Sequence, residues 1–191
     1  MTDLALVAGV SAFVAAVATG VGAVFLGLFF SKGQPWGTLN DLASIVLMIG
    51  TIPVALFVAD VTGSTVSALV AGGVALVGIG GMAAASVAQG LLVLRVRTYE
   101  ALLPWTLGAG AVVGVWYVLV GVTGLATGFP TPLAILAIVA GVGFVAMGYG
   151  FWRGNERHPA SIAGGLVMLV ASTAFLIWIG IAALAAHGLS R

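Results

Sequence analysis

Long uninterrupted runs of apolar residues alternate with short polar segments along the whole chain. The apolar runs cover approximately residues 4–30, 39–59, 64–94, 99–127, 133–152 and 160–187. A helix needs about 20 apolar residues to cross the hydrocarbon core of a bilayer, and every run reaches that length. Polar and apolar residues do not alternate within the runs as they do in the strands of a membrane barrel. The pattern therefore predicts an all-α fold, a polytopic membrane bundle of six transmembrane helices that forms one domain over residues 1–191.

The composition leaves too few charges for a surface that faces water. Of the 191 residues, 62% are hydrophobic and 6% are charged, whereas soluble domains carry about 25% charged residues. Lipid must therefore solvate most of the surface. Six Lys and Arg against five Asp and Glu form neither a basic arm nor an acidic tail, which argues against nucleic acid as a partner. Because the chain has no cysteine, disulfides and thiolate metal sites are excluded.

The basic residues fall in alternate connections between the predicted helices. Lys32 lies in the first connection, Arg95 and Arg97 in the third, and Arg153 and Arg157 in the fifth, while the second and fourth contain no Lys or Arg. Since short basic loops are retained in the cytoplasm, this distribution predicts that both termini lie outside. The opposite orientation would require five of the six basic side chains to cross the membrane.

Small residues recur on one face of several predicted helices. In the first segment they follow one another at intervals of three or four residues, which places them on a single face: Gly9, Ala12, Ala16, Gly20, Ala23 and Gly27. The fourth segment contains a GxxxG pattern, and helices associate in lipid through close backbone approach over such residues. The residues predicted to pack against other helices are Gly20, Gly27, Gly110, Gly114 and Gly121. The alternative is that these glycines serve a flexible or gated pathway. The second segment has few small residues, so we expect it to face lipid more than the others.

No charged residue lies near the middle of any predicted helix, and all of them fall at or beyond the ends of the apolar runs. Charged side chains deep in a membrane usually mark proton, ion or voltage-sensing pathways, so these classes are disfavoured. No GxSxG, HExxH or Walker-type sequence occurs. His158 and His187 are predicted at opposite faces of the membrane, where they cannot share a metal. We therefore expect no catalytic residue, no cofactor and no metal site.

Four side chains are candidates for lining a small cavity. Gln89 is the deepest strongly polar residue, more than one helical turn inside Arg95, and its amide needs a partner in another helix or in a water-filled pocket. Trp116 and Tyr117, near the middle of the fourth segment, and Trp178 in the sixth are the other three. The alternatives are an interhelical hydrogen bond for Gln89 and packing against glycine for the aromatic residues.

The residues before the second apolar run form the most distinctive local pattern. Thr38 followed by Asp41 is typical of a capping box, with the carboxylate complementing the helix dipole. The stretch QPWGTLNDL at 34–42 resembles a segment of six-helix bacterial membrane proteins to which no activity is attached. The matching residues are Pro35, Trp36, Gly37, Asn40 and Asp41. The resemblance implies a location in the bacterial cytoplasmic membrane and no particular chemistry. In size, the chain also resembles substrate-binding components of vitamin transporters, but it lacks the polar substrate-contacting residues that those usually carry.

These observations favour a non-enzymatic membrane protein, an accessory or assembly subunit that packs through its small-residue faces. Its expected partners are the lipid bilayer and either other membrane subunits or further copies of itself. The alternative is a channel or facilitator for a small neutral or apolar solute, lined by the four cavity candidates. A third hypothesis is a lipid-modifying enzyme, whose candidate residues at the cytoplasmic face are Asp41, Glu100, Glu156 and His158.

Overall fold

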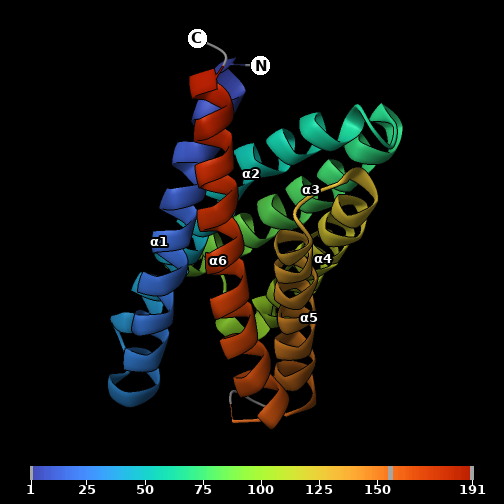
Figure 1. Cartoon of the computed structure of the whole chain (residues 1–191). Coiled ribbons are helices and arrows are strands. Elements are labelled where there is room, and N and C mark those ends of the chain that lie inside the picture. Colours follow the sequence, from blue (N-terminus) through green and yellow to red (C-terminus); the bar gives the residue numbers. More distant parts are fainter. Residues whose placement is uncertain (1, 155–156, 190–191) are drawn as a thin grey trace.

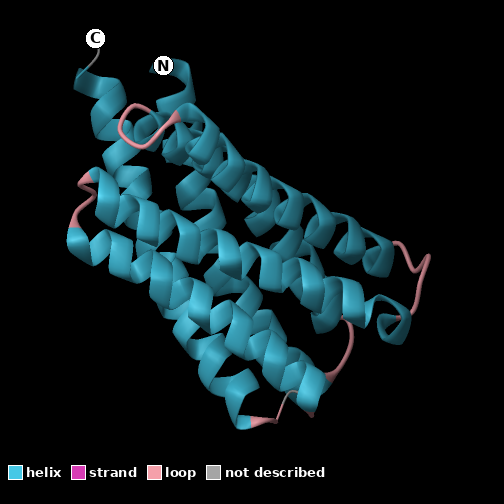
Figure 2. Ribbon diagram, turned by 90° about the vertical axis from the view of Figure 1, so that its right-hand side faces the viewer, coloured by secondary structure: helices cyan, strands magenta, loops and turns pink. Residues whose placement is uncertain are grey.

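The computed structural model describes residues 2–154 and 157–189, and this part of the chain folds into six α-helices joined by short connections (Figure 1). The helices are α1 (Thr2–Lys32), α2 (Trp36–Gly63), α3 (Ala68–Val93), α4 (Tyr99–Thr127), α5 (Thr131–Arg153) and α6 (Pro159–Leu189). The described residues contain no strand (Figure 2). Each helix is long and apolar enough to cross a bilayer. The chain is thus an integral membrane protein, and the all-α fold with six transmembrane helices predicted from the sequence is confirmed.

The helices form a closed ring in chain order. Each helix packs against the next one along the chain, and α6 closes the ring by packing against α1 (Figure 1). The two termini lie side by side at one end of the bundle, together with the α2–α3 and α4–α5 connections (Figures 1 and 2). The connections after α1, α3 and α5 lie at the opposite end, which we call the basic end (Figure 1).

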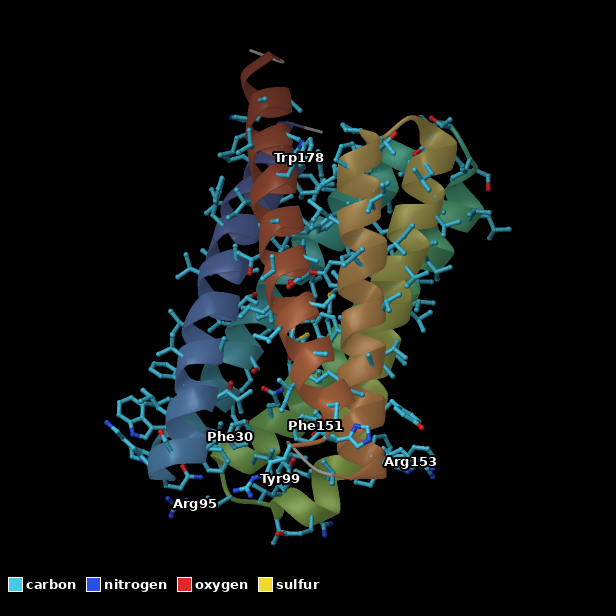
Figure 3. The ribbon with its side chains drawn as sticks, turned by 60° about the horizontal axis from the view of Figure 1, so that its bottom comes forward. Phe30, Arg95, Tyr99, Phe151, Arg153 and Trp178 are labelled. Atoms are coloured by element: carbon cyan, nitrogen blue, oxygen red, sulfur yellow. The ribbon has the colours of Figure 1, made fainter. Side chains whose placement is uncertain are left out.

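The basic end carries positive charges together with aromatic rings. Arg95, Tyr99 and Arg153 lie there, whereas Trp178 lies toward the termini (Figure 3). The guanidinium carbon of Arg153 lies 5.9 Å from the centroid of the Trp152 ring, and both Tyr99 and Trp152 are exposed. Exposed aromatic rings beside basic residues are typical of the headgroup layer at a membrane surface.

Backbone geometry explains where α3 and α4 end. At the end of α3, the Arg95 N–H donates to the Leu92 carbonyl at 3.0 Å and the Val96 N–H donates to the Leu91 carbonyl at 2.9 Å. These two bonds define a Schellman motif, which requires a left-handed residue at the position of Arg95. Arg95 has a φ of 55° and is the one non-glycine residue with positive φ in the described part of the chain. The end of α4 uses Gly128, with a φ of 82°.

The start of α2 differs from the predicted capping box. The helix begins at Trp36, so Thr38 is its third residue and Asp41 lies in its second turn. The backbone N–H and the hydroxyl of Thr38 each donate to Gln34 Oε1 at 3.2 Å. The prediction of a box between Thr38 and Asp41 is therefore wrong, because the side chain that accepts from a backbone amide of the first turn is that of Gln34.

The small-residue face of α1 is covered along only part of its length. An added Cβ at Gly9 would lie 2.7 Å from the Leu184 side chain of α6, and Ala12 is completely buried. Gly20 and Gly27, on the same face, have nothing within 4 Å of an added Cβ. In the most apolar part of each helix, 28% of the residues of α1 are buried, compared with 39% of the residues of α2. The expectation that the second helix faces lipid more than the others is therefore wrong, since α1 is the most exposed helix.

Candidate functional site

Aromatic rings fill the centre of the helix ring. Trp116 and Tyr117 of α4 are 0% and 1% exposed. Tyr117 stacks on Phe144 of α5 with ring centroids 5.7 Å apart, and it meets Phe175 of α6 edge-on at 5.5 Å. The Trp116 ring lies 4.7 Å from Tyr117. Each such pair adds about 0.5–1.5 kcal/mol beyond the burial of its area. These four residues, the central aromatic cluster, join α4, α5 and α6 at the core.

Trp116 connects this cluster to α3. An added Cβ at Gly78 would lie 2.5, 2.6 and 2.7 Å from three atoms of the Trp116 side chain, so the ring occupies the space that a larger residue would need. The indole Nε1 is buried and has no hydrogen-bond partner. Leaving a buried N–H unpaired costs about 1–3 kcal/mol. Because the indole N–H makes no hydrogen bond that would hold Trp116 in place, the packing of its ring against Gly78 explains why the ring lies here.

The other two cavity candidates lie away from the central aromatic cluster. Gln89 follows Gly78 by eleven residues on α3, which is about 16 Å along the helix axis. Its Oε1 is buried and has no hydrogen-bond partner. Trp178 is 37% exposed on the outer surface of α6. The structure thus brings Trp116 and Tyr117 into contact and does not add Gln89 or Trp178 to them.

Two of the predicted packing glycines lie at the crossing of α4 and α5. An added Cβ at Gly114 would stand 2.9 Å from the Gly141 carbonyl oxygen, and one at Gly121 would stand 2.5 Å from the Ala134 carbonyl oxygen. Gly143 makes the same kind of contact with the backbone of α6. Glycine is required at these places because the backbones of neighbouring helices approach too closely for a Cβ.

A second set of helical glycines is uncovered, with nothing within 4 Å of an added Cβ: Gly20, Gly27, Gly72, Gly73, Gly80, Gly90, Gly108, Gly110 and Gly188. Gly110 belongs to this set, so only Gly114 of the GxxxG pair packs inside the chain. Gly80 and Gly108 lie in a surface groove of about 410 Å³ between α3 and α4, whose lining includes Trp105 and Val112. We call it the α3–α4 groove.

The candidate enzyme residues lie at the starts of three helices. Asp41 is half-buried in the second turn of α2, and Glu100 is exposed in the first turn of α4. His158 precedes α6, and its Nδ1 accepts the Ala160 N–H at 3.2 Å, which caps the helix. Glu156 lies outside the described residues. Within residues 2–154 and 157–189, no group of three or more His, Asp or Glu is arranged to hold a metal ion.

Comparison with known proteins adds no family to this picture. No protein-family model matches the chain, no curated protein matches it, and no solved structure matches it. The class defined by the fold, an integral membrane protein of six transmembrane helices, therefore comes from the chain itself.

Proposed function

We propose that this chain is a non-enzymatic assembly subunit that receives a further transmembrane helix in its α3–α4 groove. The observation that carries the proposal is the pair Gly80 and Gly108, which come from neighbouring helices and both remain uncovered. Glycine in a helix interior costs about 1 kcal/mol relative to alanine. Within the chain, no packing contact offsets this cost at the two glycines. A further helix that packed on them would make close backbone contacts.

Neighbouring residues support this interpretation. Gly81, next to Gly80, faces inward, and an added Cβ there would lie 2.9 Å from Val112 and 3.1 Å from Val113 of α4. The α3–α4 contact is therefore already complete on its inner side, and Gly80 takes no part in it. Inside the chain, the crossing at Gly114 and Gly141 shows that this protein uses glycine where helices meet closely.

The second candidate is a facilitator for a small neutral or apolar solute. Its support is Gln89, whose buried oxygen lacks the hydrogen-bond partner that a polar group in a membrane requires. The central aromatic cluster opposes a permanently open path, because its rings are buried and in mutual contact. The assembly subunit is therefore the better supported function.

The proposed location is a bacterial cytoplasmic membrane, with the basic end in the cytoplasm and both termini outside. Lys32, Arg95 and Arg153 all belong to the basic end (Figures 1 and 3). The positive-inside rule then favours this orientation. The partner helix belongs either to another subunit or to a second copy of the chain.

The proposal is tested by weighing the intact assembly. The tagged protein is extracted in a mild detergent and measured by native mass spectrometry. We expect wild type to exceed the mass of one chain, and we expect Gly80→Leu and Gly108→Leu to release the monomer, because each leucine fills the α3–α4 groove. The measured mass distinguishes a second copy from a different subunit.

Gly27→Leu is the matched control, since Gly27 is equally uncovered but lies on α1. This variant should keep the mass of wild type. If wild type had the mass of one chain, or if all three leucine variants dissociated equally, the proposal of an assembly subunit would be contradicted. Solute flux into vesicles that disappears in Gln89→Leu would then favour the facilitator.

A further inference from the structure

A second groove runs along the outer surface between α1 and α2. It has a volume of about 520 Å³, and all the residues that line it are apolar. Its floor is formed by the small side chains of Ala18 and Ala43, which are buried. Its walls include Val17 and Val21 of α1, both exposed, and Leu42 of α2. We call it the α1–α2 groove. Small residues between larger neighbours create a channel on the membrane-facing surface.

The length of the α1–α2 groove is comparable to the thickness of one leaflet of the bilayer. On α1 the groove extends from Phe13 to Phe25, which is about 18 Å along the helix axis. Half of a hydrocarbon core about 30 Å thick is about 15 Å. Because α1 ends at Lys32, at the basic end, the greater part of the groove, from Val17 to Phe25, lies in the half of the helix nearer that end. Its length therefore suits an extended hydrocarbon chain of the leaflet at that end.

Lys32 and Trp36 lie beyond the end of the α1–α2 groove, at the level where the headgroup of a lipid bound in the groove would lie. Lys32 lies seven residues beyond Phe25 on α1, and Trp36 lies seven residues before Ala43 on α2. Seven residues are two helical turns, so both side chains continue the faces that line the α1–α2 groove. The rings of Phe25 and Trp36 are 5.8 Å apart, which closes the groove at the depth where tryptophan usually meets headgroups.

The charge around this end of the groove is positive. The segment 31–40 contains Lys32 and no Asp or Glu. Asp41 precedes Ala43 by two residues, about 200° around the helix, so it faces away from the α1–α2 groove. A phosphate at this place would meet one basic side chain and no opposing carboxylate.

We propose that the α1–α2 groove binds an anionic glycerophospholipid of the leaflet at the basic end. One acyl chain lies between α1 and α2 over Ala18 and Ala43, and the headgroup phosphate pairs with Lys32. Lipid tails are as apolar as the groove, so the tail supplies shape complementarity more than net affinity. Lys32 supplies the preference for an anionic headgroup. This inference does not depend on the proposed assembly through α3 and α4.

The probes are dioleoyl phosphatidylglycerol and dioleoyl phosphatidylcholine, which share their acyl chains and differ in charge. The purified full chain in mild detergent receives an equimolar mixture, and native mass spectrometry counts the lipid that each chain retains. We expect phosphatidylglycerol to be retained about fivefold more, the factor that one basic residue near an anionic surface contributes.

Two variants separate the headgroup from the tail. Lys32→Gln should abolish the preference, because phosphatidylglycerol then loses more retention than phosphatidylcholine, whose choline cation already offsets its phosphate. Val21→Trp should reduce retention of both lipids, because the indole fills the α1–α2 groove from an exposed wall position. Arg97→Gln is the control for charge, and Val10→Trp is the control for bulk, since Val10 is exposed on α1 outside the groove lining. Both controls should behave as wild type.

Equal retention of the two lipids by wild type would overturn the proposal. The same loss in Arg97→Gln as in Lys32→Gln would do so as well, because the preference would then be a property of the whole basic surface. A second chain is the competing occupant of the groove. It is tested with Val21→Cys in lipid vesicles treated with copper(II) phenanthroline as the oxidant, where a disulfide-linked dimer would show that protein covers the groove, and its absence would support the lipid.

Discussion

Trp116 packs against α3 at a position where a side chain larger than glycine has no room. An added Cβ at Gly78 would overlap the indole, with distances of 2.5 to 2.7 Å. We therefore expect Gly78→Ala to lower the free energy of unfolding by about 1–3 kcal/mol, the usual cost of overpacking a core. Thermal unfolding in mild detergent measures the change. Trp116→Phe should restore part of the loss when it is combined with Gly78→Ala, because the smaller ring makes space.

Gly73→Ala is the matched control on the same helix. Gly73 has nothing within 4 Å of an added Cβ, so alanine should leave the stability unchanged or raise it through its higher helix propensity. An equal loss of stability in Gly73→Ala and Gly78→Ala would show that the cost does not come from the contact with Trp116.

At the scale of the helix, Arg95 shows a conflict between local geometry and charge. The Schellman motif at the end of α3 places Arg95 at a φ of 55°, which favours glycine. We expect Arg95→Gly to raise the free energy of unfolding by up to about 1 kcal/mol, because the strain of the left-handed conformation exceeds the added freedom of the unfolded chain. Thermal unfolding again measures the change.

Arg97→Gly provides the comparison, since Arg97 lies in the same connection without positive φ. That variant should gain no stability. If Arg95→Gly were less stable than Arg97→Gly, the side chain of Arg95 would be contributing more through its contacts than its backbone costs.

The spans of the helices follow from the sequence, whereas their neighbours do not. Long apolar runs ended by charge predict each helix because lipid imposes that composition on every span. The small-residue face of α1 predicts packing at Gly9 and equally at Gly20 and Gly27, yet α6 covers only the first of these. Spacing along one helix shows which residues share a face. It does not show how far a neighbouring helix follows that face before the two diverge.

The sequence likewise does not show which candidate residues of different helices meet in the folded molecule. Trp116 and Tyr117 are adjacent in the sequence, and the structure places both in the central aromatic cluster. Gln89 and Trp178 were candidates because a polar or large aromatic side chain lies within a membrane-spanning run. Residue type and depth say nothing about the distance between residues on different helices. Phe144 and Phe175, which complete the cluster, are ordinary apolar residues of their helices and gave no signal. The α3–α4 and α1–α2 grooves depend on the relative positions of neighbouring helices, so the sequence pattern could not predict them either.

The orientation of the whole bundle is the remaining property that charge predicts. Five basic residues lie in or directly beside the connections at the basic end, and the retention of short basic loops predicts that this end faces the cytoplasm. Because the chain has no cysteine, single cysteines report position without a background. Thr98→Cys lies at the basic end and Thr65→Cys at the terminal end, and both threonines are exposed. We expect an impermeant thiol reagent added to intact expressing cells to label Thr65→Cys and to reach Thr98→Cys only after the membrane is permeabilised. Labelling of Thr98→Cys in intact cells would reverse the orientation, and it would move the lipid site at Lys32 to the outer leaflet.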